Sequence, residues 1–248
     1  MAHNPTIPIE VDKLKRITQE MLQDLPAPIQ RYMEYTGVIG MKEISTVKLK
    51  YTGEFRTGAD KPWMPMTAFE SYTTNPASFL WDAKFKIAGI PLLRVTDKYE
   101  NGKGSMLGKL AGIKTIFDIK DSEELNQGAL VRYLNEIMWF PTAFFSEKIS
   151  WQAIDGQSAR VTYTDYGTSV SARLIIDEEG KLKNFIAQRY RGLDDDFSLD
   201  TWSTPISAYK EFSGLKLPSA GSGVWNLSSG DFTYIKLSLK EIKYNFAS

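Results

Sequence analysis

Apolar and polar side chains alternate along most of the chain, in short segments separated by turn residues. Ser78–Ala88 is the clearest example, because its apolar residues fall mainly on every second position. Successive side chains of a β-strand point to opposite faces, so this pattern predicts a strand with one buried and one solvated face. The dipeptide Asn101-Gly102 favours a tight hairpin turn between two such segments. Alternation at hairpin spacing therefore predicts a meander of antiparallel strands.

About a dozen segments show this strand pattern. Long strands rich in aromatic residues favour a strongly curved sheet, an open or half β-barrel whose concave face holds a ligand. The acidic stretch Asp194–Asp196 is expected to be a solvated loop. The predicted strands are Thr46–Thr57, Met66–Thr74, Ser78–Ala88, Leu92–Glu100, Gly104–Leu107, Ile113–Lys120, Ser150–Ile154, Ala159–Thr164, Thr168–Asp177, Lys181–Arg191, Thr204–Phe212, Leu215–Leu227 and Phe232–Asn245.

Helical spacing of apolar residues occurs at the start and in the middle of the chain. Val11–Leu25 and Ile29–Thr36 are predicted to be short helices that end at prolines and at a glycine. Asn126–Phe145 is predicted to be a central helix that Pro141 kinks or ends. The fold class is therefore mainly β with minor α: one domain over 1–248, with a helical segment (1–40) and a half-barrel (41–248) whose cavity the helix 126–145 caps.

Composition excludes several kinds of chemistry. The chain has no cysteine, and its one histidine is His3, so thiolate nucleophiles, zinc sites and Ser–His–Asp triads have no ligands or bases to use. Thirty basic residues balance thirty acidic ones, which argues against a nucleic-acid partner. We find no nucleotide-binding fingerprint, so neither a metal nor a cofactor is expected. The first residues lack the apolar core of a signal peptide, and no run of 18 apolar residues exists, so we expect a cytoplasmic protein without a membrane span.

Aromatic residues make up 12% of the chain, and methionines accompany them on the alternating strands. Packing of the sheet core accounts for most such residues. On a concave face they would also line a cavity for a small apolar or aromatic molecule, because methionine suits adaptable apolar surfaces. The residues predicted to bind a ligand are Met66, Tyr72, Trp81, Phe85, Tyr99, Met106, Trp139, Trp202 and Trp225.

Three charged residues fall on apolar strand faces: Asp97 in Leu92–Glu100, Glu70 in Met66–Thr74 and Arg189 in Lys181–Arg191. A carboxylate on an apolar face is either paired or has a raised pKa. Salt bridges account for many such residues. If these three converge, they supply an acid, a base and an anion clamp for proton-transfer chemistry without a cofactor. Arg132 and Glu136 on the central helix form an alternative pair, for which a surface position at i,i+4 spacing is favoured.

Several blocks of sequence resemble a family of uncharacterised bacterial proteins. They include LPAPIQRYMEYTGV (Leu25–Val38), WMPMTAFESYTT (Trp63–Thr74) and QGALVRYLNEIMWFPTAFF (Gln127–Phe145). The family has no established function to transfer. More weakly, ISAYKEFSGLKLPSAG (residues 206–221) resembles the late hairpin of bacterial lipoprotein-carrier proteins, which implies an open β half-barrel with an apolar cavity.

These features support three hypotheses about function. The first is a cofactor-independent enzyme of cyclase, decarboxylase or isomerase type, which deprotonates an apolar or aromatic metabolite in natural-product biosynthesis. The alternative is a protein that binds or carries a lipid, fatty acid or pigment without catalysis. The third is an interaction module. An enzyme is expected to have convergent polar groups with shifted pKa values deep in its cavity, whereas a carrier has polar groups only at the mouth.

Overall fold

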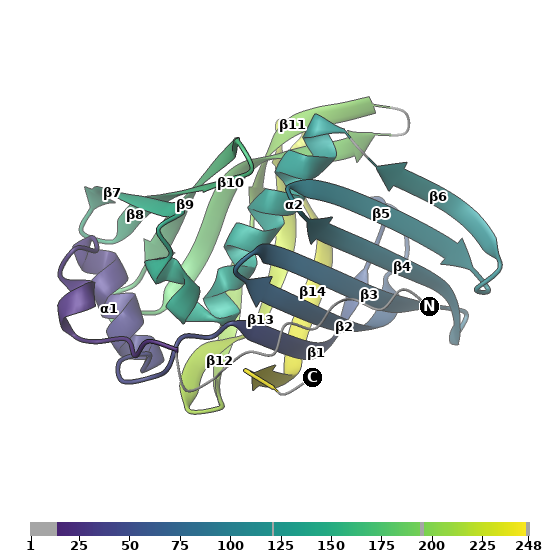
Figure 1. Cartoon of the computed structure of the whole chain (residues 1–248). Coiled ribbons are helices and arrows are strands. Elements are labelled where there is room, and N and C mark those ends of the chain that lie inside the picture. The colour runs from purple at the N-terminus through teal and green to yellow at the C-terminus, as the bar shows by residue number, and fades with distance from the viewer. Residues whose placement is uncertain (1–13, 121, 194–195, 247–248) are drawn as a thin grey trace.

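The computed structural model describes residues 14–120, 122–193 and 196–246. Fourteen strands and two α-helices lie within these residues (Figure 1). The helices are α1 (Ala27–Thr36) and α2 (Glu123–Glu136). The strands are β1 (Thr46–Phe55), β2 (Met64–Thr74), β3 (Ala77–Ile87), β4 (Ile90–Glu100), β5 (Lys103–Leu110), β6 (Lys114–Lys120), β7 (Ile149–Asp155), β8 (Ser158–Asp165), β9 (Thr168–Ile176), β10 (Leu182–Leu193), β11 (Asp196–Ser203), β12 (Ile206–Phe212), β13 (Leu215–Leu227) and β14 (Gly230–Tyr244).

All strands join one antiparallel sheet in the order β6-β5-β4-β3-β2-β1-β14-β13-β11-β10-β9-β8-β7, and β12 pairs with β13. Figure 1 shows the sheet curled around α2, which crosses its concave side. Register shifts interrupt several pairs, including β1 with β14 at Lys50 and Tyr51. Such bulges increase the local twist and let a long sheet bend. The predicted mainly β half-barrel with a central helix is therefore confirmed.

The alternation predicted from the sequence corresponds to burial in the strands that form the concave face. In β3, Phe79, Trp81, Ala83 and Phe85 are buried, and the residues between them are more exposed. Ile87, at the end of the same strand, is exposed and departs from the pattern. Inward-facing side chains therefore form the core against α2.

The predicted helix at Val11–Leu25 is wrong where the structure describes it, from residue 14 onward. Arg16 forms an isolated β-bridge with Lys42, and the backbone N–H of Ile17 donates to the carbonyl oxygen of Met41 at 2.9 Å. These tertiary bonds occupy backbone groups that a helix would use, and only Glu20–Leu22 forms a 3₁₀ turn. The apolar spacing instead reflects packing, because Ile17 and Leu22 are buried.

The central helix begins earlier and ends earlier than predicted. The Ser122 hydroxyl caps it by accepting from the N–H of Leu125 at 3.1 Å. The chain continues after Glu136 as two 3₁₀ turns, Ile137–Trp139 and Pro141–Phe145. Proline disfavours the α-helical conformation of the preceding residue, which accounts for the break before Pro141.

Strand β11 was not predicted, because its sequence DFSLDTWS does not alternate cleanly between apolar and polar residues. It forms through its pairing with β10 and β13. Asp196 therefore begins a strand instead of lying in the predicted acidic loop, whereas Asp194 and Asp195 lie outside the described residues.

Candidate functional site

A cavity of about 530 Å³ lies between α2 and the concave face of the sheet. Its volume is within the range of small-molecule sites, about 300–1,000 Å³. Gly128 and Ala129 of α2 contribute to its lining. Gly128 lies close to β10, because a Cβ there would meet the carbonyl oxygen of Tyr190 at 3.5 Å. Most of its lining is apolar, and its aromatic and sulfur-containing side chains include Phe55, Trp81, Phe85, Met106, Phe117, Trp139, Phe197, Trp202 and Trp225.

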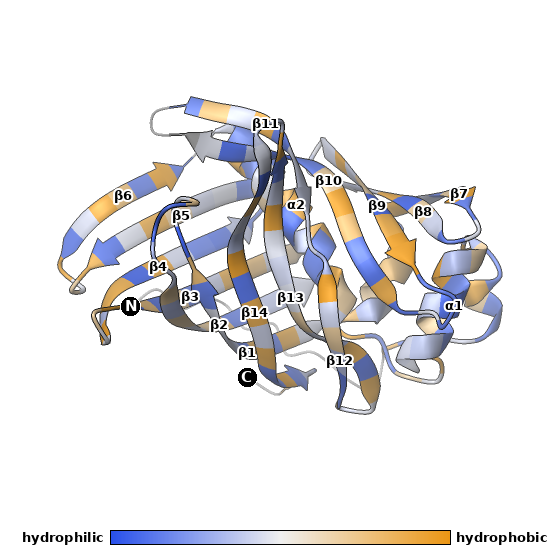
Figure 2. Cartoon of the chain, turned by 180° about the vertical axis from the view of Figure 1, so that it is seen from behind, coloured by the Kyte–Doolittle hydropathy of each residue, from blue (hydrophilic) through white to orange (hydrophobic). Residues whose placement is uncertain are grey.

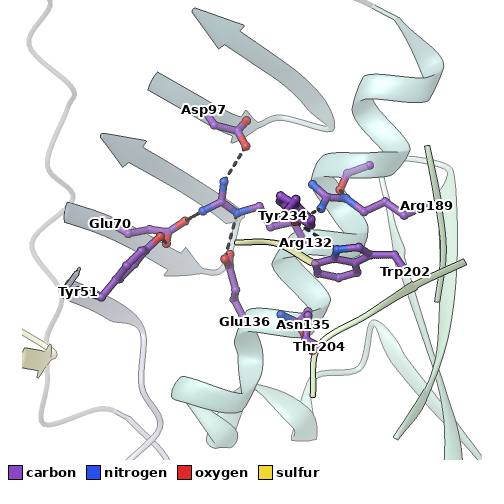
Figure 3. A network of polar contacts seen from close by, with 11 residues as sticks. Tyr51, Glu70, Asp97, Arg132, Asn135, Glu136, Arg189, Trp202, Thr204 and Tyr234 are labelled. Carbon is purple, nitrogen blue, oxygen red and sulfur yellow. Dashed lines mark hydrogen bonds and ion pairs between the residues drawn. The ribbon is translucent and has the colours of Figure 1, made fainter. Parts of the chain in front are cut away.

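Arg132 of α2 binds three carboxyl groups at the wall of this cavity (Figure 3). Its Nη2 lies 2.8 Å from Glu70 Oε1, and its Nη1 lies 2.7 Å from Asp97 Oδ2. Its Nε lies 3.0 Å from Glu136 Oε1, one helical turn away. The Arg132 side chain is only 12% exposed, and the carboxyl groups are more deeply buried. The cluster joins α2 to β2 and β4, and so holds the helix across the sheet.

Burial changes the acid–base properties of this cluster. Loss of solvation raises the pKa of Glu70 to about 8, although Arg132 opposes the shift. Burial also raises the pKa of Glu136, again against the effect of Arg132. Burial alone would lower the pKa of Arg132, but Glu136, Glu70 and Asp97 outweigh it and hold that pKa well above its ordinary value. At neutral pH, Glu70 is therefore largely a neutral acid beside a charged guanidinium.

Not every oxygen in the cluster has a partner. The hydroxyl of Tyr51 donates to Glu70 Oε2 at 2.9 Å, so both oxygens of Glu70 are occupied. Within the described chain, Asp97 Oδ1 and Glu136 Oε2 are buried and have no hydrogen-bond partner. Asp97 and Glu136 both line the cavity. Each therefore has an unmet hydrogen-bonding capacity beside the cavity.

Arg189 of β10 lies on the other side of α2 from the three carboxyl groups (Figure 3). Its Nε donates to the carbonyl oxygen of Gly128 at 3.0 Å, and its guanidinium carbon lies 4.6 Å from the centre of the Trp202 ring. Its Nη1 lies 3.5 Å from the Tyr234 hydroxyl, a long contact. No carboxyl group of the described residues forms an ion pair with it. Arg189 therefore adds an uncompensated positive charge to a mainly apolar cavity.

Comparison with known families identifies a match over most of the chain. A model of the family of unknown function DUF6544 matches residues 15–237. The chain belongs to this family. The resemblance to a family of uncharacterised bacterial proteins, predicted from the sequence blocks, is thereby confirmed. No curated protein matches this DUF6544 chain.

Solved structures are similar to this DUF6544 protein in fold. A DUF1329 family protein from Desulfovibrio piger superposes with a TM-score of 0.50 at 8% identity, covering 93% of this chain and 94% of that chain. A putative outer membrane lipoprotein-sorting protein domain from Vibrio parahaemolyticus has a TM-score of 0.48 at 9% identity, with 92% of each chain covered. A LolA superfamily protein from Nitrosomonas europaea has the same score and identity, covering 90% of this chain and 96% of that chain. The DUF1329 protein, at 8% identity, shows a similarity of fold alone.

The three residues predicted to be catalytic all point inward, but they do not form one group. Glu70 and Asp97 converge through Arg132, whereas Arg189 bonds to Gly128 and Tyr234 instead. The expectation that Arg132 and Glu136 form a surface pair is wrong, because Glu136 is buried and Arg132 is largely enclosed. The signal was in the helix itself, since α2 is apolar on more than one side and a helix of that kind is buried with its charged residues.

Six of the nine residues predicted to bind a ligand line the cavity, namely Trp81, Phe85, Met106, Trp139, Trp202 and Trp225. Met66, Tyr72 and Tyr99 are buried outside its lining. The Tyr72 ring packs 4.9 Å from that of Phe140, and the Tyr99 hydroxyl donates to Asp165 Oδ2 at 2.7 Å. Alternation along a strand shows which side chains point inward. It does not show whether another side chain fills the space in front of them.

Neither a metal site nor a membrane-spanning helix emerges from the described parts of the chain. Residues 14–120, 122–193 and 196–246 contain no cluster of three or more potential metal-ligating side chains. Among these same residues, no helix is both long and apolar enough to cross a bilayer.

Proposed function

We propose that this protein binds an apolar molecule with an anionic end in the cavity beneath α2. The observation that carries the proposal is the cavity itself, about 530 Å³ and lined mainly by apolar side chains of the sheet and helix. Such a surface favours ligands by removing apolar area from water. The aromatic lining accepts flat rings as well as flexible chains.

Arg189 supports the anionic end of this ligand. Its Nε is used by Gly128, but its Nη2 has no hydrogen-bond acceptor among the described residues. A guanidinium binds a carboxylate through two parallel hydrogen bonds, and a mainly apolar surrounding strengthens such a pair. The raised pKa of Glu70 removes one negative charge that would repel an anion.

The first experiment identifies the molecule that is bound to the purified protein. Native mass spectrometry of protein purified without detergent is expected to show a bound lipid, fatty acid or pigment. After removal of this ligand, palmitate is expected to displace a fluorescent probe such as 1-anilinonaphthalene-8-sulfonate, with hexadecanol and naphthoate as comparisons. Failure of every apolar compound to bind would contradict the proposal.

The second experiment tests the anion clamp. Arg189→Gln is expected to weaken palmitate binding by about tenfold or more, because charged hydrogen bonds contribute about 1.5–3 kcal/mol. Hexadecanol binding is expected to change little. Arg173→Gln is the matched control, since Arg173 is an exposed arginine of β9 that pairs with Asp155. Equal losses for acid and alcohol would show that Arg189 only supports the cavity wall.

One observation favours a second candidate, a cofactor-independent enzyme of cyclase, decarboxylase or isomerase type. Asp97 Oδ1 and Glu136 Oε2 are unpartnered carboxyl oxygens at the cavity wall, where a base could accept a substrate proton. Mass spectrometry of the co-purified ligand after incubation distinguishes the two functions. A carrier returns the ligand unchanged. An enzyme converts it, and both Asp97→Asn and Glu136→Gln would then slow the conversion.

A further inference from the structure

Two neighbouring hairpin turns carry the same five-residue pattern. The turn between β3 and β4 contains Lys-Ile-Ala-Gly-Ile (Lys86–Ile90), and the turn between β5 and β6 contains Lys-Leu-Ala-Gly-Ile (Lys109–Ile113). Both tips lie at one end of the sheet (Figure 1). The backbone N–H of Ala111 donates to the carbonyl oxygen of Leu92 at 2.7 Å, so the two tips are in direct contact. We refer to residues 84–93 and 107–117 together as the twin tips.

The turn residues of the twin tips are unusual for their conformation. Ala88 and Ala111 both have a φ of 50°, and the glycines that follow also have positive φ. Hairpin turns of this type favour asparagine, aspartate or glycine at the first position. The turn between β4 and β5 follows that rule with Asn101 at a φ of 52°. The twin tips therefore have an apolar residue where a polar one would be better suited to the backbone.

Large apolar side chains of the twin tips are exposed to solvent. The exposed fractions are 57% for Ile90, 89% for Ile113 and 52% for Ile116. Ile87 is also exposed. Figure 2 shows hydrophobic colour in these tips. Exposed apolar residues that gather in one place mark an interaction site more often than isolated ones do.

All charged side chains of the twin tips are positive. The tips contain Lys84, Lys86, Lys109 and Lys114 and no aspartate or glutamate, although the whole chain has as many acidic as basic residues. The acidic side chains that flank them, Asp82 and Asp118, pair with Arg94 at 2.6 Å and with Lys120 at 3.0 Å. The twin tips are therefore both apolar and basic.

We propose that the twin tips dock the protein on the surface of an anionic phospholipid bilayer. Isoleucine side chains would enter the boundary between headgroups and acyl chains, and the lysines would bind the phosphate groups. Phe85, Leu93 and Phe117, which belong to the same segments, line the cavity. Docking therefore brings the cavity lining next to the acyl chains, which provides a route for ligand exchange. Docking itself does not require the cavity to be occupied, so its test is independent of ligand binding.

Co-sedimentation with vesicles tests this inference on the full chain. We expect binding to vesicles of phosphatidylcholine and phosphatidylglycerol (3:1), weaker binding in high salt and little binding to pure phosphatidylcholine. Ile90→Asn with Ile113→Asn is expected to weaken binding at least about tenfold. Ile154→Asn with Leu199→Asn is the matched control, because these residues are also exposed but lie elsewhere. Lys86→Gln and Lys114→Gln are each expected to weaken binding about fivefold.

A turn variant separates docking from a structural role. Ala88→Asn with Ala111→Asn places the favoured residue in both turns, so the melting temperature is expected to stay the same or rise. Vesicle binding by this variant is nevertheless expected to fall, because two polar side chains replace apolar ones at the tips. Absence of binding to anionic vesicles, or equal binding by the tip and control variants, would overturn the inference. So would a dimer that the tip substitutions dissociate, since the patch would then join two copies of the chain.

Discussion

The two ends of β3 differ in what lies in front of them on the concave side. Phe79 and Phe85 occupy the same face of one strand, and both are about 2% exposed or less. Phe79 belongs to a closed half, where aromatic rings fill the space beneath α2. Phe85 lines the open half, which is the cavity. The same alternating pattern therefore produces solid core at one end and a cavity at the other.

The helix and the segment after it account for this difference. In the closed half, the Tyr133 ring of α2 lies 6.4 Å from that of Tyr99, and the Phe140 ring lies 4.9 Å from that of Tyr72. In the open half, α2 contributes residues without large rings to the cavity lining, among them Leu125, Gly128 and Ala129. Arg132 lies at the boundary, with its guanidinium carbon 4.9 Å from the rings of both Phe79 and Trp81. Aromatic rings of α2 and of the segment after it thus fill one half of the concave side, and the other half stays open.

The largest expected effect on stability comes from replacing Arg132, which lies at the boundary between the two halves. Arg132→Met is expected to lower the free energy of unfolding by about 5 kcal/mol, because three buried carboxyl groups lose their common cation. Chemical denaturation measures the change. Arg173→Met, at an exposed ion pair, is the control and is expected to cost less than about 1 kcal/mol. Replacing Glu70 and Asp97 by leucine in the Arg132→Met variant is expected to restore much of the loss, and failure of that rescue would contradict an electrostatic cause.

Truncation of the two phenylalanines of β3 tests the comparison directly. Phe79→Ala is expected to cost about 3–4 kcal/mol, since it leaves a void in packed core. Phe85→Ala is expected to cost at least about 1 kcal/mol less, because its side chain already borders empty space. Urea denaturation of both variants provides the measurement. Equal losses would show that the cavity half is as tightly packed as the closed half.

The pH dependence of stability tests the state of Glu70. Its pKa of about 8 in the fold exceeds its ordinary value, so between about pH 4.5 and 8 the unfolded chain is ionised while the folded protein keeps the proton. The contribution of Glu70 to the free energy of unfolding is thus fully present below about pH 4.5 and is lost as the pH rises to about 8. Glu70→Gln is expected to remove this decrease. Glu241→Gln, an exposed partner of Lys50, is the control, and identical pH profiles for wild type and Glu70→Gln would refute the raised pKa.

Filling the open half is expected to have the smallest effect on stability and a clear effect on binding. Met106→Trp adds volume to the cavity wall, so it is expected to weaken binding of a fluorescent apolar probe about tenfold, or about 1.4 kcal/mol. Its melting temperature is expected to change little, because the added ring occupies empty space. Unchanged probe binding would place the probe outside this cavity.

Much of the sheet could be predicted because strand alternation is a local property of the backbone. Alternation along the strands correctly predicted that Glu70, Asp97 and Arg189 point inward, since adjacent side chains of a strand point to opposite faces. The same reasoning did not find β11, whose alternation breaks before Trp202 and which pairs with β10 and β13. The i,i+4 spacing of Arg132 and Glu136 led to the wrong prediction of a surface pair, because such a pair has the same sequence whether it is exposed or buried.

The sequence by itself determined the mainly β architecture, the central helix and which charged residues turn toward the concave face. Only the tertiary structure decided that Glu70 and Asp97 meet at Arg132, that Arg189 lies apart from them and that Tyr72 and Tyr99 face filled space. The physical reason is the range of the interactions. Alternation concerns neighbouring residues, whereas Arg132 is 62 positions from Glu70 and 35 from Asp97. Contacts over such separations depend on how the helix packs across the curved sheet, and that packing also leaves the cavity open.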